Sequence, residues 1–238
     1  MRILATIILA CVALAAVASR QFVETSAQFM GSTTAPVTTY PCTIAAWYKP
    51  SNTTSNHSIV YIGSTTDARR FLLYRNASGS GNVIRASAVP DGGGAGADAV
   101  GTTAVSDTAR WYHVVGVFAS ATSRKVYVDG VPDGTNTTSI TTTSLNRFAI
   151  GARGAPVPTW GVYANGKIAE VSVWNVALSD SEISQLAEGA NPQWIQRSSL
   201  QSYVPLCTDL SPDIDITGST IGLTNSPSAS LDHPPVFR

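Results

Sequence analysis

The sequence predicts an all-β protein, a sandwich of two antiparallel sheets with one short helix near the C-terminus. Side chains alternate between apolar and polar over much of residues 43–206, which is the period of a pleated strand. A hairpin signal, Asp129-Gly130, lies within this region, and a helical period appears only around residues 179–189. The chain of 238 residues is long enough for one such domain with a sizeable core.

The clearest pair of strands lies within residues 111–130. Side chains alternate along residues 114–119 and again along 125–128, with a polar link of turn-forming residues between them. Asp129-Gly130 follows, and this pair accepts positive φ at low cost, so it predicts a tight hairpin turn. Both stretches are rich in β-branched residues, and we expect them to form the centre of a sheet.

Upstream of this hairpin, the alternation predicts several further strands. They lie at residues 20–30 (one edge strand or two short ones), 43–49, 59–62, 71–74 and 83–89. Residues 51–58, which include His57, are predicted to be a polar loop. Residues 90–101 are so rich in glycine that we expect an exposed, mobile loop.

Downstream, strands are predicted at residues 147–151, 167–174 and 200–206, with a proline-containing loop at 152–164. Between the last two strands the period changes. Ser179 and Glu182 have the spacing of a capping box, an apolar stripe follows, and Gly189 ends the segment. This pattern predicts a helix of about two to three turns, the only helix expected in the chain.

Residues 1–18 are predicted to be a signal peptide or an apolar N-terminal arm. A minimal positive region precedes an almost continuous apolar run, and Ala16-Val17-Ala18 has the small-x-small pattern cleaved before Ser19. The run is short for a membrane span of about 20 residues. An uncleaved anchor, an arm used in assembly and a lipoprotein signal at Cys11 remain alternatives.

The rest of the chain is predicted to hold one domain and a tail. Residues 19–207 would form the sandwich, and residues 208–238, which contain prolines, an extended tail over the sandwich or a partner. Charged residues make up 13% of the sequence and the formal net charge is +0. No basic run is present, which argues against nucleic acid and against an anionic membrane surface. The surface, rich in serine and threonine, suits an extracellular or particle-surface protein.

Three segments of the sequence resemble one family. WYHVVGVF followed by KVYVDG is similar to its central hairpin, CTIAAWYKP to an early strand, and GKIAEVSVWNVALSDSEISQL to its last core strand and short helix. The sequence thus resembles laminin-G-like, concanavalin A-like jelly-roll domains over about residues 20–207. The resemblance implies a jelly-roll fold, and its motifs mark a fold rather than an activity.

The sequence does not favour an enzyme. Hydrolases of related fold supply two carboxylates from one strand as Glu-x-Asp-x-x-Glu, and this chain has no such run. Glu170 stands alone in its strand, where the resemblance implies a structural role. His113, a single histidine in a strand, is more typical of a structural residue than of a base.

Two aromatic residues are the candidates for ligand binding. Trp160 and Tyr163 lie in a predicted Pro/Gly loop rather than on an alternating strand, and sugar rings stack on such side chains. The alternative is that they anchor this loop on the sheet.

Calcium binding and a disulfide bond are two further predictions from the sequence. The resemblance implies that loop oxygens can bind calcium, and the loop aspartates predicted as ligands are Asp67, Asp91, Asp98 and Asp133, although they show no ligand spacing. The terminal strands of a jelly roll are neighbours, so Cys42 and Cys207 could form a disulfide in an oxidising compartment. The alternative is two buried thiols.

We therefore predict a non-catalytic extracellular module for recognition or adhesion. It would bind glycans or a cell-surface partner through edge loops, and it would be secreted, with no membrane span after processing. The alternative is a structural or decoration protein of a virus particle or other surface assembly, which would self-assemble through its apolar N-terminus and tail. The terminal residues 233–236 resemble those of laminin-G-like proteins of tailed phages. A glycoside hydrolase is the third possibility.

Overall fold

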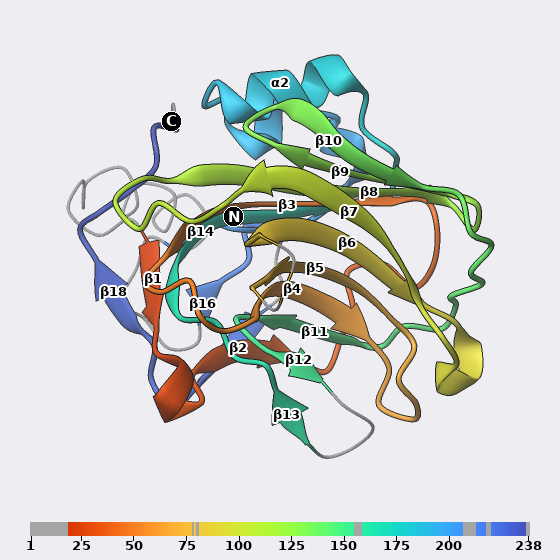
Figure 1. Ribbon diagram of the computed structural model, residues 1–238, viewed down its shortest axis with the longest axis horizontal. Coiled ribbons are helices and arrows are strands. Elements are labelled where there is room, and N and C mark those ends of the chain that lie inside the picture. The colour runs from red at the N-terminus through yellow and green to blue at the C-terminus, as the bar shows by residue number, and fades with distance from the viewer. Residues whose placement is uncertain are drawn as a thin grey trace, which may run out of the picture.

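The computed structural model describes residues 19–77, 79, 81–154, 159–206, 213–217 and 220–236. Within them the chain forms two antiparallel sheets packed face to face, which confirms the predicted sandwich (Figure 1). The predicted signal peptide or arm, residues 1–18, lies outside the described residues. No helix in these ranges is long and apolar enough to cross a membrane.

The first sheet contains the hairpin that the sequence marks most clearly. Its strands are β1 (Ser19–Phe22), β3 (Cys42–Pro50), β8 (Tyr112–Ser120), β9 (Ser123–Val128), β10 (Val131–Asn136), β14 (Gly166–Trp174), β15 (Leu200–Val204) and β18 (Ser228–Ser230). Their order is β10-β9-β8-β3-β14-β1-β18, and β15 pairs with the part of β14 that β1 leaves unpaired.

The second sheet lies opposite the first. Its strands are β2 (Phe29–Ser32), β4 (His57–Gly63), β5 (Arg70–Asn76), β6 (Val83–Val89), β7 (Ala97–Ala104), β11 (Arg147–Ile150), β16 (Asp213–Ile214) and β17 (Thr220–Thr224). Their order is β16-β17-β2-β11-β4-β5-β6-β7. A small separate hairpin of β12 (Arg153–Gly154) and β13 (Trp160–Gly161) packs near β4.

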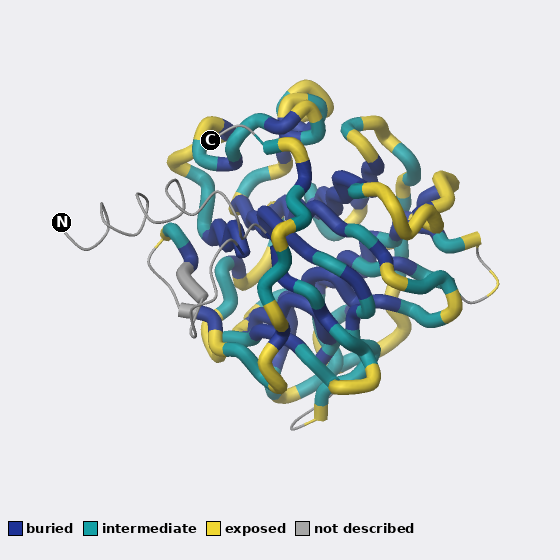
Figure 2. Tube along the Cα trace, turned by 90° about the vertical axis from the view of Figure 1, so that its left-hand side faces the viewer, coloured by how far each residue is buried: buried dark blue, intermediate teal, exposed yellow. Residues whose placement is uncertain are grey.

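The main core lies between the two sheets. It is built from alternate residues of the strands, such as Phe71 and Leu73 on β5 and Val171 and Val173 on β14, all fully buried. Burying a side chain of this size stabilises the fold by about 1.5–3 kcal/mol. Figure 2 shows the buried segments, in dark blue, running through the centre of the molecule. Exposed segments are concentrated in the connections between strands.

A short helix covers the outer face of the first sheet. Helix α2 (Asp180–Ala187) begins at the predicted capping box, in which the Ser179 side chain accepts from the Glu182 amide. Ile183 and Leu186 are buried against Tyr127 and Trp174 of the sheet. The helix prediction is therefore confirmed, but the described chain also contains 3₁₀ turns at η1 (Glu24–Ser26), η2 (Asp91–Gly93), η3 (Pro192–Trp194) and η4 (Arg197–Ser199).

The predicted turn after β9 is also confirmed. Asp129 and Gly130 have φ values of 50° and 81° and join β9 to β10. This is the combination that a two-residue hairpin loop needs, since both central residues then follow the twist of the strands.

Several predictions from the sequence differ from the structure. Residues 152–164 are not all loop, since they contain β12 and β13. His57 is not in a loop but begins β4 and is buried. Residues 97–101 are not loop but part of β7, an edge strand of the second sheet. Parts of the predicted tail are strands of the two sheets, because β17 pairs with β2 and β18 pairs with β1. Edge pairing of backbone groups needs little apolar alternation, so the sequence pattern does not mark these strands. Contact of the tail with a partner stays a prediction.

Candidate binding site on the second sheet

The outer face of the second sheet carries polar and aromatic side chains. On β5, Phe71 and Leu73 point into the core, so Arg70, Leu72 and Tyr74 point outward. On β6 the same alternation turns Arg85, Ser87 and Val89 outward. The strand period alone therefore places these six residues on one surface.

Strand register brings the outward residues into one row. Leu72 lies opposite Tyr61 of β4 on one side and opposite Ser87 of β6 on the other. Ser87 in turn lies opposite Asp98 of β7. Because directly opposed residues of neighbouring strands have Cβ atoms about 4.5–5.5 Å apart, this row forms a continuous floor.

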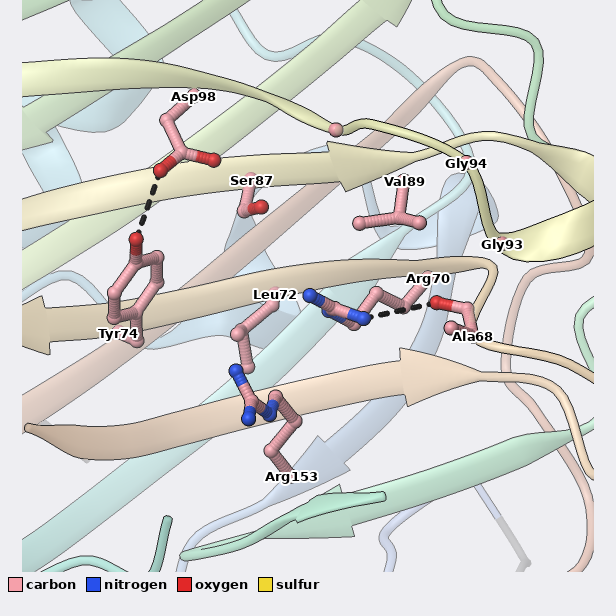
Figure 3. A pocket seen from close by; sticks show the side chains of 11 residues that line it. Ala68, Arg70, Leu72, Tyr74, Ser87, Val89, Gly93, Gly94, Asp98 and Arg153 are labelled. Carbon is pink, nitrogen blue, oxygen red and sulfur yellow. Dashed lines mark hydrogen bonds between the residues drawn. The ribbon is translucent and has the colours of Figure 1, made fainter. Parts of the chain in front are cut away.

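An open depression of about 400 Å³ lies over this floor (Figure 3). Its lining residues come from β5, β6, β7, the loops before β5 and β7, and the β12–β13 hairpin: Ala68, Arg70, Leu72, Tyr74, Ser87, Val89, Gly93, Gly94, Gly96, Asp98 and Arg153. Gly96 lets the loop lie directly on β6, since a Cβ there would be 2.7 Å from the Ala88 carbonyl oxygen. The depression is thus a rigid sheet surface with a rim of loop backbone.

One side of the depression holds a hydrogen-bonded carboxylate. The Tyr74 hydroxyl donates to Asp98 Oδ2 at 2.8 Å, and an Arg85 guanidinium nitrogen lies 3.3 Å from the same oxygen. Burial, together with the Asp98 charge, raises the pKa of Tyr74, so the phenol keeps its proton. Asp98 is therefore a fixed acceptor, and its side chain is 21% exposed.

The other side holds two arginines. Arg70 donates to the Ala68 carbonyl oxygen at 2.9 Å, and its buried Nε has no hydrogen-bond partner among the described residues. Arg153 makes no hydrogen bond or ion pair with any part of the chain that the structure describes. Figure 3 shows both guanidinium groups directed toward Leu72 at the centre of the floor. Burial and the nearby Arg153 charge lower the pKa of Arg70.

The aromatic residues predicted to bind a ligand lie on the same face, beside the depression. The Trp160 ring is 4.5 Å from the Phe29 ring, and the Arg147 guanidinium lies 3.9 Å over it. The Tyr163 hydroxyl donates to the Trp160 carbonyl oxygen at 3.2 Å. Both side chains thus pack on the sheet, as the loop-anchor alternative describes, and neither lines the depression. Their contact with a ligand stays a prediction.

The four aspartates predicted as calcium ligands are dispersed. Asp67 and Asp91 both form ion pairs with Arg69, with nitrogen–oxygen distances of 2.5 and 3.5 Å. Asp98 lies in the depression, and Asp133 accepts from Thr102 and Thr103. Asp98 and Asp133 belong to strands β7 and β10 and not to loops.

The described residues hold no group of three or more His, Cys, Asp or Glu side chains placed to bind a metal ion. Calcium binding therefore stays a prediction without a ligand cluster to support it.

Only one of the two cysteines predicted to form a disulfide lies among the described residues. Cys42 is a buried free thiol whose pKa is raised by burial, while Cys207 lies outside the described residues. Glu170, the single acid of β14, is buried and accepts from the Tyr203 hydroxyl and from His233 Nε2 at 3.0 Å. Glu170 and Tyr203 lie on β14 and β15 of the first sheet, and neither they nor His233 line the depression.

Sequence reasoning missed most residues of the depression. A signal was present for those on β5 and β6, because the period of two puts Arg70, Tyr74 and Arg85 on the face opposite the core. No local signal marks Arg153, which reaches the site from a hairpin that is distant in sequence.

Comparison with known proteins identifies the family. Residues 24–184 match the family described as the Concanavalin A-like lectin/glucanases superfamily. The chain belongs to this superfamily, as the fold and the sequence resemblance both indicate. The search of curated proteins finds no relative of this chain.

Several solved structures share the fold. A putative carbohydrate binding protein from Bacteroides ovatus has a TM-score of 0.68 at 22% identity, over 93% of this chain and 61% of that one. A heptameric SAP-like pentraxin from Limulus polyphemus has a TM-score of 0.61 at 16% identity, over 73% of this chain and 82% of that one. The CBM40 of Ruminococcus gnavus IT-sialidase, bound to alpha2,3 sialyllactose, has a TM-score of 0.51 at 17% identity, over 71% and 97%.

Proposed function

We propose that this protein is a non-catalytic, extracellular carbohydrate-binding module whose ligand occupies the depression on the second sheet. The observation that carries the proposal is the composition of that surface. A flat apolar and aromatic floor, Leu72 and Tyr74, is bordered by a fixed carboxylate, Asp98, and by cationic donors. Sugars are complementary to such a surface, because they have an apolar ring face and a periphery of hydroxyl groups.

The relatives add support of a general kind. The Bacteroides ovatus and Ruminococcus gnavus structures are described as a carbohydrate binding protein and as a CBM40 bound to a sialylated sugar. Fold alone does not transfer a ligand, so these neighbours raise the expectation of a glycan without naming it.

The lining of the depression favours binding over hydrolysis. Glycoside hydrolysis uses two carboxyl groups on either side of the scissile bond. Among the described lining residues, Asp98 is the one carboxylate, and it is held by Tyr74 and Arg85. The alternative role in a virus particle stays a prediction.

The proposal is tested by a glycan array followed by calorimetry on the best ligand. Asp98→Asn keeps the shape of the side chain and removes its charge, while Tyr74→Phe removes the donor to it. Each change should weaken glycan binding about tenfold or more, because a hydrogen bond to a charged group is lost.

Asp107→Asn is the matched control. Asp107 is exposed, accepts from the Ala109 amide and lies outside the depression. Its change should leave affinity unaltered. Absence of binding to any glycan, or binding that Asp98→Asn and Tyr74→Phe leave unchanged in folded protein, would refute the proposed site.

A further inference from the structure

We infer that the glycan recognised at this depression is acidic, with a carboxylate or sulfate group of one sugar unit held between Arg70 and Arg153. The inference rests on the proposed function and specifies its ligand class. A uronic or sialic acid and a sulfate ester share the relevant chemistry, which is an oxyanion carried on a sugar ring.

The first argument is the charge balance of the lining. Asp98 forms an ion pair with Arg85, and its charge also acts on Arg70. One carboxylate thus stands among three guanidinium groups. Arg70 and Arg153 then remain, and neither forms an ion pair with a described residue. A site that neutralises its own carboxylate and still holds two extra cations is complementary to an anion.

The second argument is the unused hydrogen-bonding capacity of the two side chains. Arg70 directs one donor to a backbone carbonyl, and its buried Nε donates to no residue that the structure describes. Arg153 donates to no described residue, although it is partly buried. The shielded and unsatisfied Nε of Arg70 is costly. A carboxylate or sulfate group accepts from guanidinium donors in pairs, with the bidentate geometry that suits arginine.

The third argument is that the two cations face each other. They come from different elements, β5 and the β12–β13 hairpin, yet both guanidinium groups are directed to the floor at Leu72 (Figure 3). Their mutual repulsion adds to burial in lowering the pKa of Arg70. An anion between them would relieve this repulsion, whereas a purely neutral sugar would leave it in place.

The test compares each acidic ligand with a neutral counterpart that lacks the negative charge. The pairs are tetragalacturonate with its methyl ester, 3′-sialyllactose with its methyl ester, and a sulfated galactan oligosaccharide with its desulfated form. The acidic member of at least one pair should bind tightly, and its neutral counterpart about tenfold or more weaker. Raising the sodium chloride concentration should weaken the acidic ligand selectively.

Arg153→Gln is the decisive variant, since this side chain makes no hydrogen bond or ion pair with a described residue and its change should leave the fold intact. It should abolish the preference for the acidic member. Arg70→Gln should act in the same direction. Arg197→Gln removes an exposed arginine beyond the first sheet and should change nothing.

The outcomes separate the two proposals. If neutral and acidic members bind equally and Asp98→Asn weakens both, the depression binds glycans but the acidic class is wrong. If Arg153→Gln retains the full preference for acid, the anion is held elsewhere and this inference fails. If no member of any pair binds, both proposals are overturned. The uronic, sialic and sulfated pairs identify which oxyanion is recognised.

Discussion

Two histidines are held in their neutral form by the packing around them. His57 Nδ1 lies beside the Tyr48 hydroxyl and 3.1 Å from an Arg75 guanidinium nitrogen. Burial, together with the Arg75 charge, lowers the pKa of His57 to about 3. Burial lowers the pKa of His113 to about 3, and its Nδ1 has no hydrogen-bond partner in the described part of the chain. Neither environment accepts a proton readily.

This arrangement predicts a loss of stability in mild acid. An unfolded histidine has a pKa of about 6.5, so between that value and about 3 the unfolded chain binds protons that the folded chain excludes. The free energy of unfolding should therefore fall as pH decreases through this window, by about 1 kcal/mol per pH unit for each histidine. Urea unfolding at pH 7, 6 and 5 measures the slope.

His113→Phe isolates the contribution of one of these residues. Phenylalanine keeps the aromatic contact with Trp47, whose ring lies 5.2 Å away, and cannot be protonated. Its unfolding free energy should depend less on pH than that of the wild type. An identical slope in the variant would show that other groups, such as carboxylates, cause the acid sensitivity.

At the scale of elements, the β9–β10 turn is fixed by one glycine. Gly130 has a φ of 81°, and a Cβ at this position would lie 3.0 Å from Ala187 Cβ on helix α2. Gly130→Ala should therefore lower the free energy of unfolding by about 1–3 kcal/mol, since it combines backbone strain with a steric contact. Thermal and urea unfolding give the value.

Gly222→Ala serves as the control for this change. Its Cβ would meet the Gly31 carbonyl oxygen at 3.7 Å, an ordinary contact, so stability should change by less than about 0.5 kcal/mol. Equal effects at both positions would contradict the role assigned to the turn.

The strands with clear alternation could be predicted from the sequence. Residues 83–89 form β6 within the predicted bounds, and the helix begins at its predicted cap. Strand β7 was missed because glycine, alanine and threonine give it little apolar pattern, and its place at the sheet edge demands none.

The candidate site could be predicted only in part. The strand period puts Arg70 and Tyr74 on the same face of β5. The sequence does not show whether a helix covers that face. In the structure, α2 packs on the first sheet and leaves this face of the second sheet uncovered by it. Arg153 enters through the tertiary placement of a two-residue strand. Trp160 was expected as a ligand contact because aromatic loop residues are common in such sites, but its ring packs on Phe29 and under Arg147.

At the scale of the whole molecule, the C-terminal segment, residues 220–236, adds a strand to each of the two sheets and so connects them. Strand β17 extends the second sheet and β18 the first. Beyond β18, the Asp232 carboxylate accepts from Lys49 and Lys167 at 2.8 Å and from Trp111 Nε1 at 2.9 Å. Burial acts to raise the pKa of Asp232, but these hydrogen bonds outweigh it and hold the pKa below its usual range.

Deleting residues 220–238 should expose both sheets to association. Strands β1 and β2 would lose their outer partners, and unpaired strand edges recruit other chains. We expect lower stability and concentration-dependent oligomers, measured by urea unfolding and light scattering.

Asp232→Asn removes the charge that holds the C-terminal segment but keeps β17 and β18 paired. It therefore separates the effect of the Asp232 contacts from the effect of covering the strand edges. It should cost about 1 kcal/mol, because the cluster is partly exposed and screened, and leave the protein monodisperse. A truncated chain that stays monodisperse and as stable as the full chain would show that the segment is dispensable.

The Ser19 hydroxyl donates to the Asp232 carbonyl oxygen at 2.6 Å, so the two ends of the described sandwich adjoin each other. They lie at the β1–β18 margin, whereas the depression lies over β5, β6 and β7, near the margin where β7 contacts β10. A linker attached at either end would therefore tether the domain from the same point. Immobilisation through that point would leave the arginine-lined surface accessible to the proposed glycan ligand.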